Sequence, residues 1–298
     1  MKFFVIFLLL FSSFKTWAHS QVLSTCSKDG ALISVEENSH QILFENNSQK
    51  LIYPASLVKL MTAYLTFEAL QKNQLNLHKE LTFSSRAQEI SRINKVNTLG
   101  IKEGDKISVE KALQALIIKS FNEASIVLAE AIADNEWNFA RQMNKKALEL
   151  GMINTSFRNA SGLHEEGQYT TASDLARLAI HLKKDFPQFY YFFAMKEFVY
   201  NGKIIKTHNR FLIEYDGAEG MKTGYTNVSG YNLVSSAKNA QKRIFAVVTG
   251  CSSSRKRDDL SKFLLDLSFL EEQENNNFNF KKISVKSANE IYDYEKKK

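Results

Sequence analysis

The chain has 298 residues, of which 44% are hydrophobic and 24% are charged, a composition typical of a protein that folds around a core. Its 39 lysines and arginines exceed its 32 aspartates and glutamates, but no long basic run is interleaved with aromatic residues, so nucleic acid is not an expected partner. Only two prolines and 12 glycines are present, without a Pro/Gly-rich hinge, which favours a single main domain.

The first 18 residues are typical of a signal peptide. Lys2 precedes the apolar run 3–14, and Thr16 and Ala18 supply small residues at the positions that a signal peptidase inspects. We expect cleavage after Ala18 and export to the periplasm or another extracytoplasmic space. A retained membrane anchor is the alternative, but the run is shorter than the roughly 20 residues that span a bilayer.

The mature chain begins with a predicted hairpin. Segments 31–37 and 41–47 alternate apolar and polar residues around a short break. A second hairpin is expected near the end of the domain, from segments 231–237 and 243–250. The last of these is almost entirely apolar, which indicates a central strand.

A helix is predicted over residues 56–71, where apolar residues recur at helical spacing. Ser56 and Lys59 lie at its start and three residues apart, so they share one helix face. A neutral lysine there could remove the serine proton, because burial and a second cation both disfavour the charged amine. An N-cap serine with a solvated lysine is the favoured explanation for this pair taken alone.

A second long helical stretch is predicted over residues 109–133. Ser120 and Asn122 interrupt its apolar run, and both residue types are poor choices inside a helix. A break that presents a hydroxyl and an amide to a cleft is one interpretation. A capped turn between two helices is the other.

A further helix is expected to begin at Thr171, whose hydroxyl can cap it, and to stop before Pro187. After it comes Lys222, Thr223 and Gly224, a triplet at a predicted strand edge. Glycine permits close approach of a ligand to the backbone, while the cation and hydroxyl could hold a carboxylate. An ordinary turn explains the triplet equally well.

We expect residues 19–272 to form the domain and residues 273–298 to form a polar tail, in which 280–285 could be one strand. Export would permit a disulfide between Cys26 and Cys251, but nothing in the sequence shows that they meet, and two separate buried thiols are the favoured interpretation. The six histidines form no ligand-spaced pair, so neither a metal nor a cofactor is expected.

Taken in order, the three motifs resemble the SxxK, SxN and KTG set of the penicillin-interacting serine enzymes. Longer stretches are similar to the low-molecular-mass D-alanyl-D-alanine carboxypeptidases, serine peptidase family S11. They include YPASLVKLMTAY, LGIKEGDKISVEKALQALIIKSFNEAS, GMINTSFRNASGLHEEGQYTTASDLARLA and EGMKTGYTNVSGYNLVSSA. The resemblance covers about residues 25–270. It implies an α+β fold of the β-lactamase/DD-peptidase type, with a central antiparallel sheet of about five strands flanked by a helical subdomain.

The resemblance also implies roles for the motif residues. Ser56 would be the acylated nucleophile, Lys59 its general base and Ser120 the group that passes a proton to the leaving amine. The implied substrate-binding residues are Asn122, Lys222, Thr223, Gly224 and Tyr225, with backbone N–H groups of Ser56 and Tyr225 forming an oxyanion hole. The expected partners are peptidoglycan stem peptides, which would lose their terminal D-alanine, and β-lactams as covalent inhibitors.

The sequence departs from the family pattern in two ways, and each departure leads to a prediction. Phe121 occupies a position where relatives often have glycine, and we expect its ring to narrow the cleft. The β-rich second domain and the carboxyl-terminal amphipathic anchor of relatives are not recognisable, so peripheral membrane attachment is not expected.

Three alternative functions remain open. A D-alanyl endopeptidase would use the same fold. A class A β-lactamase needs a glutamate to activate water, and Glu165 and Glu166 lie in a connector that resembles the carboxypeptidase one. A non-catalytic peptidoglycan-binding or penicillin-sensing protein would not require a nucleophile beside a tunable amine.

Overall fold

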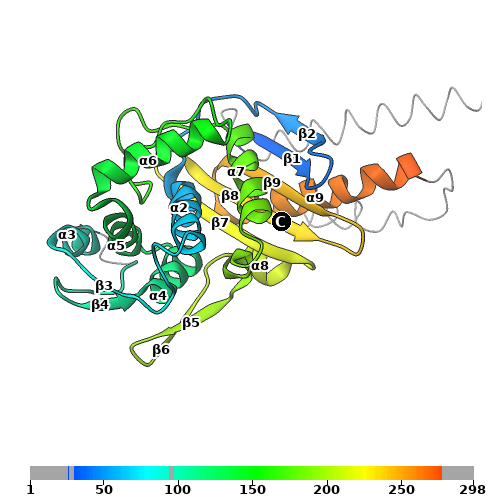
Figure 1. The fold of residues 1–298 in the computed structure, drawn as a ribbon. Helices are drawn as coiled ribbons and strands as arrows, with labels where there is room; N and C mark the ends of the chain where they lie inside the picture. Colours follow the sequence, from blue (N-terminus) through cyan, green and yellow to red (C-terminus); the bar gives the residue numbers. More distant parts are fainter. Residues whose placement is uncertain (1–25, 27–29, 94–96, 277–298) are drawn as a thin grey trace, which may run out of the picture.

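The computed structural model describes residue 26 and residues 30–93 and 97–276, with side chains up to residue 270 (Figure 1). The expected signal peptide over residues 1–18 and the possible strand over 280–285 lie outside the described residues. Among the described helices, none combines the length and the apolar character needed to span a bilayer.

A five-stranded antiparallel sheet forms the centre of the fold, in the order β2-β1-β9-β8-β7. Its strands are β1 (Leu32–Glu36), β2 (Ile42–Asn46), β7 (Ala218–Thr226), β8 (Gly230–Lys238) and β9 (Arg243–Cys251). Both predicted hairpins are confirmed, and the apolar strand β9 is central as expected. β1 pairs with β9, so the two ends of the domain meet in one sheet. β7 is left at an edge.

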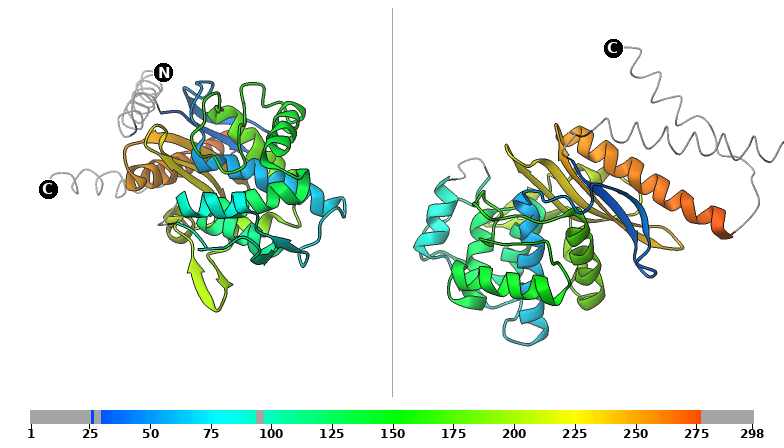
Figure 2. Two further views of the ribbon diagram at one scale, coloured as in Figure 1. Left: turned by 90° about the vertical axis from the view of Figure 1, so that its left-hand side faces the viewer. Right: turned by 90° about the horizontal axis from the view of Figure 1, so that it is seen from above.

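The two faces of the sheet carry separate apolar clusters because side chains alternate along a strand. Phe245 and Val247 of β9 point to the main core, whereas Ile244, Ala246 and Val248 belong to a second cluster. α7 (Ala172–Asp185) packs on the first face, and α9 (Ser254–Asn276) and α8 (Arg210–Glu214) contact strands from the other side (Figures 1 and 2).

A helical region lies beside the sheet on the α7 side (Figure 2). Its elements are a 3₁₀ turn η1 (Ala55–Val58), α2 (Lys59–Gln71), α3 (Ser85–Ile93), α4 (Val109–Gln114), a π-helical turn η2 (Ala115–Lys119), α5 (Asn122–Ala133) and α6 (Glu136–Glu149). Two short antiparallel pairs, β3 (Glu80–Thr82) with β4 (Lys106–Ser108) and β5 (Glu197–Tyr200) with β6 (Lys203–Lys206), and a 3₁₀ turn η3 (Tyr190–Ala194) complete the fold. This α+β arrangement confirms the expected fold class.

The helices differ from the sequence predictions in two places and agree with them in one. The stretch 109–133 is not one helix: it breaks at Ser120, which has a left-handed φ of 66°. α7 begins as predicted, since Thr171 Oγ1 accepts a hydrogen bond from the Asp174 N–H at 3.0 Å. α9 was not anticipated, because the face that it buries includes polar and charged residues such as Arg257, Asp258 and Ser261, which weaken its apolar periodicity.

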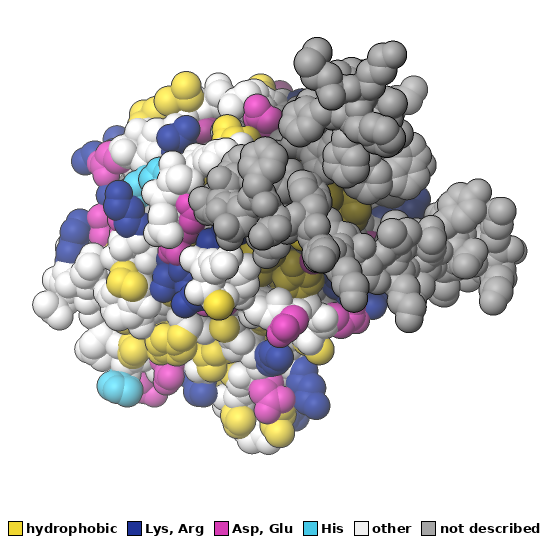
Figure 3. Space-filling model, turned by 90° about the vertical axis from the view of Figure 1, so that its right-hand side faces the viewer, with side chains coloured by type: hydrophobic (Ala, Val, Ile, Leu, Met, Phe, Trp, Pro, Cys, Tyr) yellow, Lys and Arg dark blue, Asp and Glu magenta, His cyan; other side chains and the backbone are white. Residues whose placement is uncertain are grey.

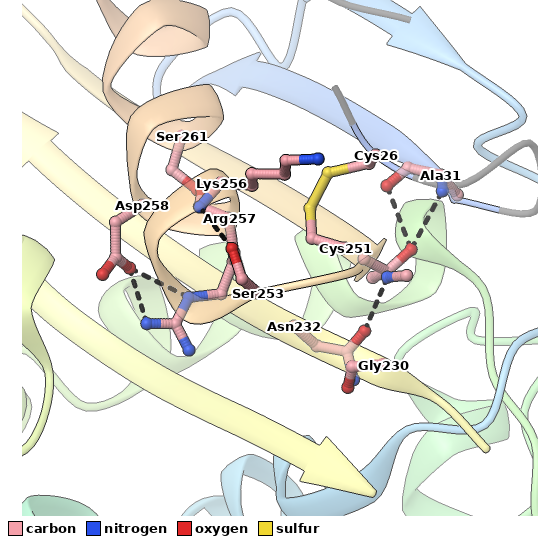
Figure 4. The surroundings of a disulfide bond; sticks show 12 residues. Cys26, Ala31, Gly230, Asn232, Cys251, Ser253, Lys256, Arg257, Asp258 and Ser261 are labelled. Atoms are coloured by element: carbon pink, nitrogen blue, oxygen red, sulfur yellow. Dashed lines mark hydrogen bonds and ion pairs between the residues drawn. A yellow bond between two sulfur atoms is a disulfide. The ribbon is translucent and has the colours of Figure 1, made fainter. Parts of the chain in front are cut away.

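The expectation of two separate thiols is wrong. A disulfide joins Cys26 to Cys251, the last residue of β9, beside the turn into α9 (Figure 4). The pairing of β1 with β9 explains why residues 225 apart in the sequence can meet.

On the face in Figure 3, basic and acidic side chains of the described residues are interspersed, with small hydrophobic areas between them. The described part of this face has no large area of a single charge sign.

Candidate active site

The predicted nucleophile Ser56 lies in η1, directly before α2, and is partly exposed. Ala55 before it has a φ of 50°, an unusual value for a residue with a side chain. Gly162 supports this turn: at a φ of +82° it packs so closely that an added Cβ would collide with the Ala55 carbonyl. A strained backbone held from outside is a common feature of functional sites.

Lys59 lies one turn from Ser56, at the start of α2. Its side chain is 1% exposed, and its Nζ lies 3.1 Å from Ser56 Oγ and 2.7 Å from Asn122 Oδ1. Nζ also donates to the Ser161 carbonyl oxygen. Burial lowers the pKa of Lys59 from 10.5 to about 7, although Glu123 and Glu136 raise it. The amine is therefore partly neutral near neutral pH.

The partners of Lys59 orient its lone pair. Asn122 Oδ1 and the Ser161 carbonyl can only accept hydrogen bonds, so each requires an N–H from Nζ. A neutral amine has two N–H groups, and its lone pair then points along the third direction, toward Ser56 Oγ. In this state Ser56 donates to Lys59, which is the arrangement that a general base requires.

The break after η2 presents Ser120 and Asn122. The left-handed conformation of Ser120 ends the π-helical turn, and such turns occur frequently at functional sites. Ser120 Oγ is buried without a hydrogen-bond partner in the structure, whereas Asn122 opens α5 and reaches Lys59. The cleft interpretation of this motif thus agrees with the geometry better than a simple capped turn.

Phe121 does not narrow a cleft as expected. Its ring is 4% exposed and belongs to the main core. The left-handed turn at Ser120 directs the following side chain into the helical region.

The third motif lies on edge strand β7, beside the serine turn. A Cβ on Gly224 would lie 3.3 Å from Pro54 O and from Leu57 N, so this glycine lets β7 approach η1 closely. Lys222 is on the same strand face as Gly224, because residues two positions apart in a strand point to the same side of the sheet. The triplet is therefore more than an ordinary turn.

Lys222 is a buried lysine that forms no ion pair within the described part of the chain. Its side chain is 1% exposed, and Nζ donates to the Thr223 carbonyl at 2.9 Å. Burial lowers its pKa well below 10.5, and the positive charges of Lys59 and Arg257 add to the effect. An anionic ligand bound here would favour the charged form of Lys222, because an opposite charge raises the pKa of a buried amine.

Thr223 and Tyr225 lie on β7 close to Lys222. Thr223 Oγ1 lies 2.8 Å from Nε2 of His208, whose pKa is held well below its usual range by partial removal from water and by the charge of Lys222. A neutral imidazole can exchange hydrogen bonds with the threonine hydroxyl. Tyr225 is half-exposed and packs on Tyr231, with ring centroids 4.3 Å apart.

Sequence reasoning missed two contributors and understated a third. The Ser161 carbonyl and Glu123 act on Lys59 from segments distant in the sequence, and His208 was considered only as one of six histidines without a ligand-spaced partner. The matching stretch NASGL around Ser161 was the only available signal, since a backbone carbonyl leaves no residue-type pattern.

Comparison with known proteins decides the family. A family model described as D-alanyl-D-alanine carboxypeptidase, peptidase S11, matches residues 19–253. The chain belongs to this family. It is 35% identical over 267 residues to the D-alanyl-D-alanine carboxypeptidase DacC of Escherichia coli, a match that covers 88% of this chain and 66% of DacC. The chain thus spans less than two thirds of that relative.

Solved structures of penicillin-binding proteins agree with the fold. Penicillin-binding protein 5 of Haemophilus influenzae has a TM-score of 0.78 and 32% identity, covering 82% of this chain and 71% of the other. Penicillin-binding protein D2 of Listeria monocytogenes, solved in its ampicillin-bound form, has a TM-score of 0.71 and 28% identity, covering 80% and 96%. The five-stranded sheet with its helical region is therefore the DD-peptidase fold.

Proposed function

We propose that this S11 protein is a serine D-alanyl-D-alanine carboxypeptidase, which removes the terminal D-alanine from peptidoglycan pentapeptide stems through an acyl-enzyme on Ser56. One observation supports it most directly. The buried Lys59 amine has two acceptor-only partners and faces Ser56 with its third direction. This arrangement supports Lys59 as the general base for the Ser56 hydroxyl. A protein that only binds peptidoglycan would not need a general base.

Substrate binding would use edge strand β7. Its outer edge has no strand partner in the sheet, so an extended peptide can pair with its backbone. The terminal carboxylate would bind between Lys222 and Thr223, where the buried Lys222 amine has no acidic partner among the described residues. This placement would direct the last peptide bond toward Ser56.

In the acylation step, Ser56 Oγ would attack the carbonyl carbon of the penultimate D-alanine while its proton moves to neutral Lys59. Backbone N–H groups of Ser56 and Tyr225 would bind the oxyanion, each worth about 3 kcal/mol. Ser120, whose hydroxyl is otherwise unpartnered, would relay a proton to the leaving D-alanine nitrogen. The C–N bond then breaks and an ester on Ser56 remains.

In deacylation, water would attack this ester, with Lys59 taking a proton from the water and the Ser56 oxygen regaining one. The products are free D-alanine and a tetrapeptide stem. A β-lactam would enter the same route and stop at the ester, in keeping with the ampicillin-bound Listeria relative.

The decisive experiment combines a diacyl-D-alanyl-D-alanine peptide with a labelled penicillin. We expect D-alanine release by the wild type and one labelled peptide that contains Ser56, identified by mass spectrometry. Ser56→Ala should lose both signals. Ser253→Ala is the matched control, because Ser253 and Lys256 have the same spacing at the start of α9 but lie outside the site, and it should retain both. D-alanine release by Ser56→Ala at the wild-type rate would overturn the assignment.

The rival activities predict different products. An endopeptidase would split purified cross-linked muropeptides without releasing terminal D-alanine from pentapeptides. A β-lactamase would turn over penicillin rapidly, but Glu165 and Glu166 are exposed, and Glu165 Oε2 accepts from Asn159 at 2.9 Å instead of lying buried beside the serine.

Export is part of the proposal. The disulfide is consistent with an oxidising extracytoplasmic compartment, where stem peptides of the cell wall are accessible. Comparison of the mass of the mature protein with cleavage after Ala18 tests the signal peptide.

A further inference from the structure

Glu123 is a fully buried carboxylate in the first turn of α5, directly after Asn122. Its exposure is 0%, and its Oε2 has no hydrogen-bond partner in the structure. Within the described chain no lysine, arginine or histidine forms an ion pair with it. Burial of a carboxylate without a cation is costly, so its position requires an explanation.

The other carboxylate oxygen anchors a connecting segment. Glu123 Oε1 accepts from Thr98 Oγ1 at 2.7 Å and from the Leu99 N–H. Asn97 Nδ2 of the same segment donates to the Lys119 carbonyl at 3.0 Å, next to Ser120. These bonds hold residues 97–99 against the turn that carries the second motif, and they fix the carboxylate in place.

Several charged groups act on Lys59 from the elements around it. Glu123 on α5 and Glu136 at the start of α6 act in the direction that favours the ammonium. Lys222 on β7 and His208, a neighbour of Thr223, interact unfavourably with a charged Lys59. Glu136 differs from Glu123 because Arg86 lies 3.3 Å from its carboxylate and offsets part of its charge.

We propose that Glu123 is a positioning residue for the reaction on Ser56: held by Thr98 and Leu99, its carboxylate stabilises the ammonium that Lys59 becomes when it takes the serine proton. The step adds no covalent chemistry. The proton moves from Ser56 Oγ to Lys59 Nζ, and the uncompensated charge of Glu123 lowers the free energy of the resulting cation. The acid of a Ser-His-Asp triad stabilises its imidazolium in the same way. This inference rests on the proposed acyl-enzyme function.

The test is the pH dependence of Ser56 acylation by labelled penicillin in the full chain. Glu123→Gln keeps an oxygen for Thr98 and Leu99 but removes the charge. We expect the acid limb of its pH profile, where the rate falls as Lys59 becomes protonated, to move to lower pH by about one unit, because a buried negative charge no longer favours the ammonium. The plateau rate should fall roughly three-fold, because Lys59 becomes a weaker base.

Three control variants separate charge from anchoring. Thr98→Val loosens the anchored segment but keeps the carboxylate, and Glu123→Asp keeps the charge with a shorter side chain. Both should retain the wild-type acid limb even where thermal stability falls. Glu136→Gln should move the limb less than Glu123→Gln, since Arg86 already offsets that charge.

The outcomes are separable from those of the proposed function. If wild-type Ser56 is not labelled at all, the carboxypeptidase assignment fails. If the wild type is labelled and Glu123→Gln has an unchanged acid limb, only the role of Glu123 fails. An acid limb displaced in Thr98→Val or Glu123→Asp would likewise overturn the proposal, because the profile would then follow anchoring and not charge.

Discussion

One amine sets the expected pH dependence of this protein. Burial lowers the pKa of Lys59 to about 7, and only the neutral amine can accept the proton of Ser56. Acylation should therefore slow as pH falls below about 7, where the ammonium predominates, and approach a plateau above it. Rates of labelling by penicillin between about pH 5 and 9 measure this. A rate independent of pH across 7 would contradict Lys59 as the base.

Gly162 makes the sharpest steric prediction. It combines a φ of +82° with close contact to the Ala55 carbonyl, so Gly162→Ala must displace the serine turn. We expect at least a ten-fold loss of acylation together with a loss of stability, measured by labelling and by denaturant unfolding.

Gly202→Ala is the matched control for Gly162→Ala. Gly202 has a φ of +75° but nothing within 4 Å of an added Cβ. It should lose only about 1 kcal/mol of unfolding free energy, the cost of a left-handed residue, and keep its acylation rate. Equal acylation by the two variants would contradict the proposed support of Ser56 by Gly162.

Among the helices, α7 begins at a capping residue that lies next to the segment leading to Ser56. Thr171 caps it, and the next residue toward the amino terminus, Thr170, pairs with Ile52 in the segment that leads to Ser56. Thr171→Val removes the capping oxygen and should lower the free energy of unfolding by about 1 kcal/mol. Thr171→Ser keeps the oxygen and should retain more of that stability. Equal losses in chemical denaturation would show that the cap contributes nothing.

The break between η2 and α5 shows why helix periodicity is not sufficient. The apolar residues of 109–133 continue at helical spacing through the break, since the elements on both sides bury their apolar residues in the same core. Serine and asparagine indicated an interruption, but their spacing could not distinguish a cleft-facing turn from a cap. Contact of Asn122 with Lys59, 63 residues earlier, decides between them.

For the molecule as a whole, the disulfide closes the domain. It connects residues 225 apart, at the amino-terminal side of β1 and the end of β9. Reduction, or replacement of both cysteines by serine, should lower the free energy of unfolding by about 2–5 kcal/mol, because the unfolded chain regains freedom. Denaturation with and without a reductant measures the loss. A reductant that lowers the midpoint of the double variant as much as that of the wild type would contradict this origin.

Much of the fold could be read from local patterns. Alternation predicted both hairpins, and the capping signal at Thr171 predicted α7. The order of the three motifs indicated a penicillin-interacting serine enzyme, and the longer matching stretches indicated the S11 family. These features depend on neighbours within a few residues, or on residue types that this chemistry requires. Both can therefore be recognised in the amino-acid sequence alone.

The assembly of the site depends on contacts between distant segments. A backbone carbonyl at Ser161 orients the Lys59 lone pair, Gly162 shapes the turn of Ser56, and Glu123 is buried where its charge reaches the amine. The disulfide between Cys26 and Cys251 also depends on a contact between distant segments. Backbone groups carry no residue-type signal, and burial and proximity arise only when the sheet and helices pack, so local patterns could not reveal them.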